Sequence, residues 1–167
     1  MSTLWPYFWP PLGAGIVIGL IVGVIAFRKR SRIRNLAFAI GAVLSIGLAA
    51  LWHGPLGGAD RFAREVNLTV RAALIYNEIP EVSGHLHSRP LTRRIMLSGP
   101  ADDFQRSELL RVMNEIPGVG SSTWTADGGG TPLIVEGIAT AVVGFLLGLL
   151  LAYLIDLRRR YNAQWNW

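Results

Sequence analysis

Residues 133–155 read LIVEGIATAVVGFLLGLLLAYLI, and the five residues after them read DLRRR. An apolar run of about 20 residues, rising ~1.5 Å per residue, crosses the ~30 Å hydrocarbon core of a bilayer. Arginines that directly follow such a run mark the end that stays in the cytoplasm. The sequence therefore predicts a membrane-spanning helix at 133–155 and a basic, tryptophan-containing cytoplasmic tail at 156–167.

Two further apolar runs lie at 12–27 and 36–52, joined by a basic turn at 28–35. The first run starts at Phe8 if the interfacial residues before it are counted. They predict a transmembrane hairpin over residues 12–52. If the basic turn and the basic tail lie on one side, the N-terminus and residues 53–132 lie on the other. Three spans require the two termini to lie on opposite sides, which this arrangement satisfies.

Composition supports a membrane protein, because 51% of the 167 residues are hydrophobic. The net charge of +5 does not indicate a nucleic-acid partner. Eight arginines oppose nine acidic residues within 53–132, so the excess positive charge lies beside the spans. The chain has no cysteine, which excludes disulfides, thiolate nucleophiles, cysteine-based zinc sites and iron–sulfur ligation.

Small residues recur at four-residue spacing on all three predicted spans. This spacing gives a helix a smooth face that another helix can approach closely in lipid. We expect these faces to pack within a three-helix bundle, with leftover faces binding other integral membrane subunits or a second copy. The alternative is that glycine is simply frequent in membrane helices. The candidate packing residues are Gly15, Gly19, Gly23, Gly41, Ser45, Gly144 and Gly148.

Aromatic and basic residues flank the predicted spans, as expected at membrane–water interfaces. Residues 1–11 combine aromatic rings with prolines, which predicts an interfacial N-terminus instead of helix core. The tail either rests on the lipid headgroups or is a docking point for a partner. The candidate interface residues are Trp5, Trp9, Trp52, Arg158, Arg159, Arg160, Trp165 and Trp167.

Glu136 is the only ionisable residue predicted within a span. Such a residue is a functional candidate. It also lies about one turn inside the outer end of the helix, where its carboxylate can reach water or a headgroup, so an interfacial role is the alternative.

Residues 53–132 predict a small α+β domain between glycine-rich linkers. Phe62, Val66, Val70 and Leu74 recur every four residues and predict a helix over 59–77. Strands are predicted at 84–89, 92–98 and 119–125. Between the last two, Asp102 or Asp103 is expected to cap a second helix, with Gln105 completing a capping box. The predicted fold class is thus three transmembrane helices with a small extramembrane domain of two helices on a mixed sheet.

This domain resembles the BON family. The resemblance is carried by IMLSGPA at 95–101, Arg106, IPGV at 116–119 and IPEV at 79–82. It implies a bacterial envelope domain that contacts phospholipid surfaces or other envelope proteins without catalysis. The predicted location is accordingly the bacterial inner membrane, with residues 53–132 in the periplasm.

Catalytic and metal chemistry find little support in the sequence. His85 and His87 could hold a metal ion with His53 or a carboxylate, but a solvent-facing pair is the alternative, and we expect no metal or other cofactor. The expected function is a non-catalytic accessory or structural subunit of a larger membrane complex, respiratory or photosynthetic, with membrane lipids and other integral subunits as partners. The alternative is a free-standing envelope phospholipid-binding or stress protein. A channel or transporter is disfavoured, because the spans carry only Glu136 as an ionisable group and show no inverted repeat.

Overall fold

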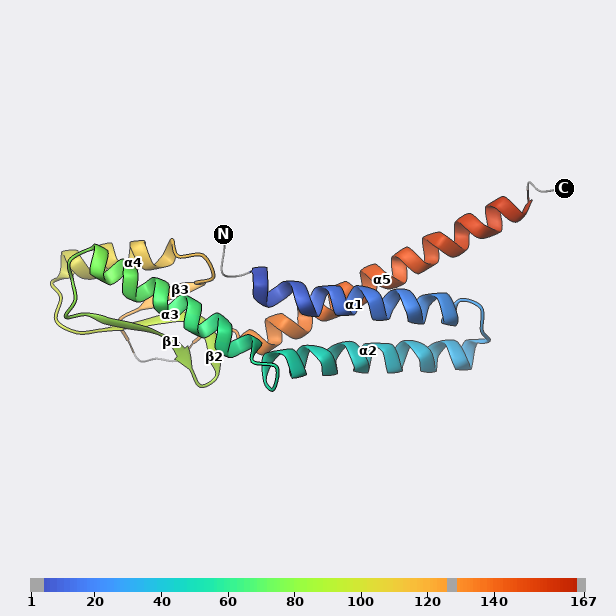
Figure 1. Cartoon of the computed structure of the whole chain (residues 1–167), viewed down its shortest axis with the longest axis horizontal. Helices are drawn as coiled ribbons and strands as arrows, with labels where there is room; N and C mark the ends of the chain where they lie inside the picture. Colours follow the sequence, from blue (N-terminus) through green and yellow to red (C-terminus); the bar gives the residue numbers. More distant parts are fainter. Residues whose placement is uncertain (1–4, 126–128, 165–167) are drawn as a thin grey trace. The chain divides into compact units, whose positions relative to one another are not determined.

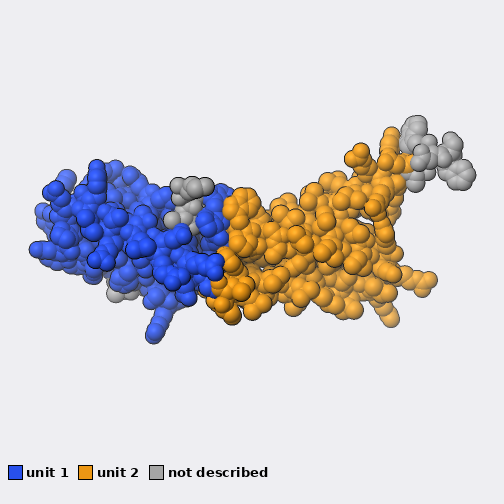
Figure 2. All heavy atoms as spheres, in the orientation of Figure 1, with its two compact units in different colours: residues 1–7, 57–136 blue, residues 8–56, 137–167 orange. Residues whose placement is uncertain are grey.

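The computed structural model describes residues 5–125 and 129–164, and the chain divides into two compact units. Unit 1 comprises residues 1–7 and 57–136, and unit 2 comprises residues 8–56 and 137–167 (Figure 2). Within the described residues, three helices are long and apolar enough to cross a bilayer, and the mixed sheet and its helices lie between the second and third of them in the chain (Figure 1). The predicted fold class is confirmed, and the chain is a multi-pass membrane protein with three candidate spans.

Helix α1 spans Trp5–Ala26 and α2 spans Ser31–His53. The helix α1 begins well before residue 12 and includes Pro10 and Pro11, which the sequence analysis placed outside it. Proline's fixed φ is compatible with a helix, and each proline removes one backbone hydrogen bond. Pro10 and Pro11 lie in the first two turns of α1, so the missing backbone hydrogen bonds affect only the start of the helix. The helix α2 likewise begins inside the predicted basic turn, at Ser31.

Helix α5 spans Leu133–Gln164, so it continues through most of the predicted tail. Leucine and arginine are good helix formers, and nothing at 156–160 breaks the helix. Arg160 Nε donates to Asp156 Oδ2 at 2.8 Å, an i,i+4 pair that supports the extension. The structure does not describe residues 165–167.

The extramembrane domain consists of α3 (Gly58–Tyr76), β1 (Ser83–Ser88), β2 (Leu91–Ser98), α4 (Asp103–Asn114) and β3 (Ser121–Thr123). The sheet order is β1-β2-β3, with β1 antiparallel and β3 parallel to β2. The four predicted apolar residues of α3 are all buried, as are Leu109 and Met113 of α4. Asp102 and Gln105 form both hydrogen bonds of the predicted capping box.

Two glycines allow the close packing of this domain. A Cβ on Gly84 of β1 would stand 2.8 Å from Val70 Cγ1 and 2.9 Å from Leu97 Cδ2, so α3 lies close to the strand. Gly99 follows β2 with a φ of +133°, a conformation that other residues rarely adopt. A Cβ there would also meet the backbone of Glu81 and Val82, which explains the glycine that ends the Leu-Ser-Gly sequence.

Candidate functional site

A groove runs along the outer edge of β1 in the extramembrane domain. Its volume is about 510 Å³, and we call it the α3–β1 groove. Leu74, Pro80 and Val82 supply apolar walls, and Asn67, Arg71 and His85 supply polar groups. The remaining lining residues are Ile75, Ser83 and Gly84. Because α3 packs tightly over Gly84, the polar side of α3 lies beside the edge of β1, and the groove lies between them.

The edge of β1 that borders the groove is not paired with another described strand. Leu86 N donates to Asn67 Oδ1 at 2.9 Å, so this backbone N–H points away from β2 and toward α3. In an antiparallel ladder, residues pointing outward alternate with residues paired across the ladder. Gly84, two residues earlier, therefore also presents its backbone N–H and C=O at the groove.

Arg71 places one positive charge at the groove. The side chain of Arg71 is exposed and has no hydrogen bond or ion pair with any other described residue, and the same holds for the side chain of His85. An unpaired arginine beside an open strand edge suits a chain that carries a carboxylate, because guanidinium and carboxylate form paired, charge-assisted hydrogen bonds. The groove thus combines main-chain hydrogen-bonding groups with a site for negative charge.

Arg71 also belongs to a second surface, the outward face of α3. Arg64, Leu68, Arg71 and Ile75 follow one another at spacings of four, three and four residues, and we call them the α3 stripe. Leu68 is 67% exposed and Ile75 is 62% exposed. Alternating arginines and exposed aliphatic side chains are typical of surfaces that rest on anionic headgroups.

Glu136 lies in the first turn of α5 and forms an ion pair. Its Oε2 accepts from Arg93 Nη1 at 3.1 Å, and the two side chains are 26% and 27% exposed. Arg93 Nε also donates to the Gly118 carbonyl at 3.0 Å, and the Arg93 carbonyl accepts from Gly120 N at 2.7 Å. The first turn of a helix favours a carboxylate. Glu136 thus joins α5 to β2, a structural role that sequence reasoning missed because nothing in the sequence pairs it with Arg93.

The candidate packing residues meet one another within unit 2. A Cβ on Gly15 would stand 2.8 Å from Phe145 N, and one on Gly19 would stand 3.0 Å from Leu149 N. On the α5 side, Gly144 approaches the backbone of Leu12 and Ile16, and Gly148 approaches that of Ile16 and Leu20. The backbones of α1 and α5 are therefore in direct contact through these four glycines.

The remaining small residues are also covered from within the chain. Gly23 faces Ala152, and a Cβ on Gly41 of α2 would stand 2.8 Å from Phe145 Cε2. Ser45 is buried, and its hydroxyl donates to the Gly41 carbonyl at 2.9 Å. The expected leftover small-residue face is not found among these residues, since each predicted stripe packs on another helix of the same chain. A partner would have to use other surfaces.

The predicted interface residues remain mostly on the surface. Trp5, Trp9, Arg158, Arg159 and Arg160 are exposed, and Trp52 is half-buried. Trp165 and Trp167 lie outside the described residues, as does part of the glycine-rich linker at 126–130.

No family model, curated protein or solved structure matches this chain.

The histidines do not come together with acidic residues. Among the described residues, no group of three His, Cys, Asp or Glu side chains is placed to hold a metal ion. His87 Nδ1 lies 2.9 Å from the Pro90 carbonyl, and His85 lines the α3–β1 groove.

Proposed function

We propose that this protein is a non-catalytic accessory subunit of a larger membrane complex, whose extramembrane domain binds an extended, acidic segment of a partner protein. The observation that carries the proposal is the unpaired edge of β1 at Gly84 beside the α3–β1 groove. An extended chain can add to such an edge through main-chain hydrogen bonds, while its side chains enter the neighbouring groove. Arg71 would then select for a carboxylate.

The anchor and the docking surface are separate in this proposal. The helices α1, α2 and α5 use their small residues to pack on one another, so they hold the domain at the membrane without needing a partner. An exposed ion pair contributes only about 0–1 kcal/mol, so Arg71 adds selectivity and the strand pairing supplies most of the affinity.

We place the domain in the periplasm of a bacterial inner membrane. The positive-inside rule supports this orientation, because both arginine-rich stretches, at 28–34 and 158–160, would then face the cytoplasm. The resemblance to BON domains supports the envelope location. The element order α3-β1-β2-α4-β3 agrees with the helix, strands, second helix and last strand that the resemblance implies.

A photo-crosslinking experiment tests the docking proposal. A benzophenone amino acid at His85 places a crosslinker in the groove, and the same group at Ser107 of α4 is the control position. We expect a specific crosslinked partner from His85 in native membranes, which Arg71→Glu reduces and Arg64→Glu leaves intact. Docking in the groove would be contradicted if Arg71→Glu and Arg64→Glu reduced the crosslinked adduct equally, or if position 85 gave no adduct.

The α3 stripe favours a second candidate function, binding of the domain to anionic phospholipid. Because the chain has no cysteine, Leu68→Cys can be labelled uniquely with an environment-sensitive fluorophore. Lipid binding predicts a blue shift of the fluorophore in proteoliposomes with phosphatidylglycerol but not in pure phosphatidylcholine. It also predicts that Arg64→Gln and Arg71→Gln reduce the blue shift equally. Docking of a protein segment in the α3–β1 groove predicts instead that the fluorescence is the same with either lipid.

A further inference from the structure

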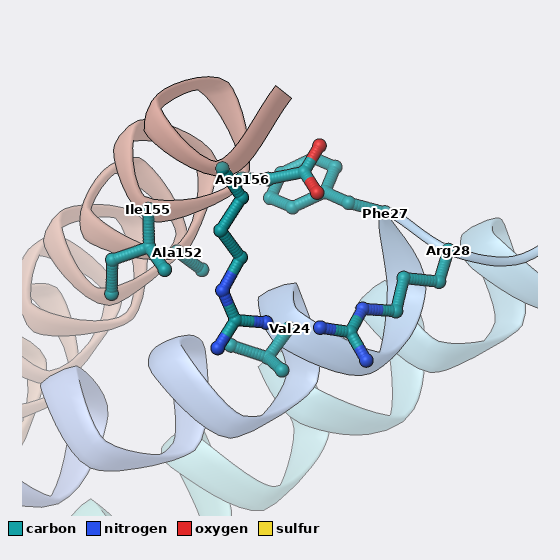
Figure 3. Close-up of a pocket in the computed structure, with 7 residues that line it drawn as sticks. Val24, Phe27, Arg28, Ala152, Ile155 and Asp156 are labelled. Atoms are coloured by element: carbon teal, nitrogen blue, oxygen red, sulfur yellow. The ribbon is translucent and has the colours of Figure 1, made fainter. Parts of the chain in front are cut away.

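A small cavity lies between the end of α1 and the second half of α5, within unit 2 (Figure 3). Val24 and Phe27 form its wall on the α1 side, and Ala152 and Ile155 form the wall on α5. Phe27 is held in place by edge-on contacts with Phe38 of α2 and Tyr153 of α5, at ring-centroid distances of 5.9 and 5.8 Å. The apolar wall is thus a fixed part of the helix bundle.

Two arginines from different helices complete the lining. Arg28 follows the end of α1, and Figure 3 shows its side chain directed back toward Val24. Arg159 comes from α5. Within the described residues, neither guanidinium has a hydrogen bond or an ion pair. Asp156 also lines the cavity, and its carboxylate accepts from Arg160, so that Arg160 balances its negative charge and the charges of Arg28 and Arg159 remain in excess.

The cavity lies where the apolar parts of α1 and α5 end. The apolar part of α1 ends at Ala26 and that of α5 ends at Ile155, so the two arginines stand where the hydrocarbon core gives way to headgroups. Ile155, which lines the cavity, is 41% exposed and can contact acyl chains. A guanidinium binds phosphate through paired, charge-assisted hydrogen bonds.

We propose that Arg28 and Arg159 together hold the phosphate of one anionic phospholipid. The cavity volume of about 10 Å³ admits one oxygen atom, so one phosphate oxygen enters and the rest of the headgroup stays outside. Two neighbouring arginines disfavour a headgroup that carries its own cation, such as choline. The site therefore prefers phosphatidylglycerol to phosphatidylcholine, and it does not depend on the role of the extramembrane domain.

Native mass spectrometry of the full chain, released from micelles containing either lipid, tests the site. We expect retained phosphatidylglycerol, with about tenfold weaker binding for Arg28→Gln and for Arg159→Gln. Arg158→Gln removes the same charge from the same basic stretch but does not line the cavity, so it should retain wild-type binding. Arg28→Lys should restore part of the binding, because it returns the charge without the paired donors.

Three outcomes would overturn the proposal. Equal weakening by Arg158→Gln would show general attraction to the basic stretch instead of a site. Undiminished binding in the Arg28→Gln/Arg159→Gln double variant would exclude the two arginines. Full displacement of the lipid by millimolar inorganic phosphate would show a site for free anions.

Discussion

Arg93 of β2 and Glu136 of α5 are joined by an ion pair of 3.1 Å, although 43 residues separate them in the sequence. Arg93 also donates to the Gly118 carbonyl, so one side chain links the sheet, the turn after α4 and the first turn of the third candidate span. The pairing accounts for an acidic residue at the start of an otherwise apolar run.

Arg93→Ala should lower the local free energy of unfolding of the extramembrane domain by about 1 to 2 kcal/mol. The loss combines a partly exposed ion pair with a hydrogen bond from a charged donor. Hydrogen exchange of the β2 amides measures it. The effects of Arg93→Ala and Glu136→Gln should be less than additive, because both remove the same pair. An ion flux through proteoliposomes that Glu136→Gln abolishes would contradict a structural role for this pair.

Gly148→Ala should destabilise the helix bundle by about 2 kcal/mol or more. The added Cβ would stand 2.7 Å from Leu20 N and meet the Ile16 carbonyl more closely, so α1 and α5 must separate. The control is Gly47→Ala in α2, where no atom lies within 4 Å of the added Cβ. The control should be neutral or slightly stabilising, because alanine favours the helix. Unfolding in mixed micelles compares the two, and equal effects would refute the close approach of α1 and α5.

Glu108 of α4 should titrate below its ordinary value. Its hydrogen bond and ion pair with Arg111 lower the pKa of this carboxyl from the ordinary 4.5. Because the folded pKa lies below the unfolded one, the pair stabilises α4 above about pH 4.5, and this contribution is lost as the pH falls through the folded pKa. A carbon-detected NMR titration should show the lower midpoint, and Arg111→Gln should return it toward 4.5. An unchanged midpoint in Arg111→Gln would contradict the assigned cause.

Asn67→Ala should expose the edge of β1. The change removes the acceptor of Leu86 N–H, which costs about 1 kcal/mol and leaves an outward-pointing donor. Open strand edges promote pairing between chains. We therefore expect the variant to form more dimers in detergent, detected by light scattering, than Asn114→Ala on α4. If Asn67→Ala formed no more dimer than the wild type, the edge of β1 would have to be closed by other means.

Local patterns predicted most of the fold. The four-residue repeat of α3, the capping box at Asp102 and Gln105, and the apolar length of the spans each act over a few residues, so the sequence shows them directly. The helices α1 and α5 extend beyond the predicted spans, because prolines near a helix start and arginines after an apolar run are both compatible with a continuing helix.

Long-range pairing was not predictable in the same way. The stripes predicted close packing of Gly19 and Gly144 within a helix bundle, but not which residues of the facing helix each of them meets. The α3–β1 groove and the Arg93–Glu136 pair arise from residues on separate elements, and no spacing in one stretch of sequence indicates them.

In the proposed topology, three spans anchor the extramembrane domain on one side of a membrane, and the arginines beside the spans lie on the other side. The absence of native cysteines permits a direct measurement with single cysteines and a membrane-impermeant maleimide. In intact spheroplasts, Ser107→Cys should be labelled, whereas Ser31→Cys and Asn162→Cys should be labelled only after lysis. Labelling of Ser31→Cys in intact cells while Ser107→Cys stays protected would contradict the proposed orientation and, with it, the envelope-facing role of the groove.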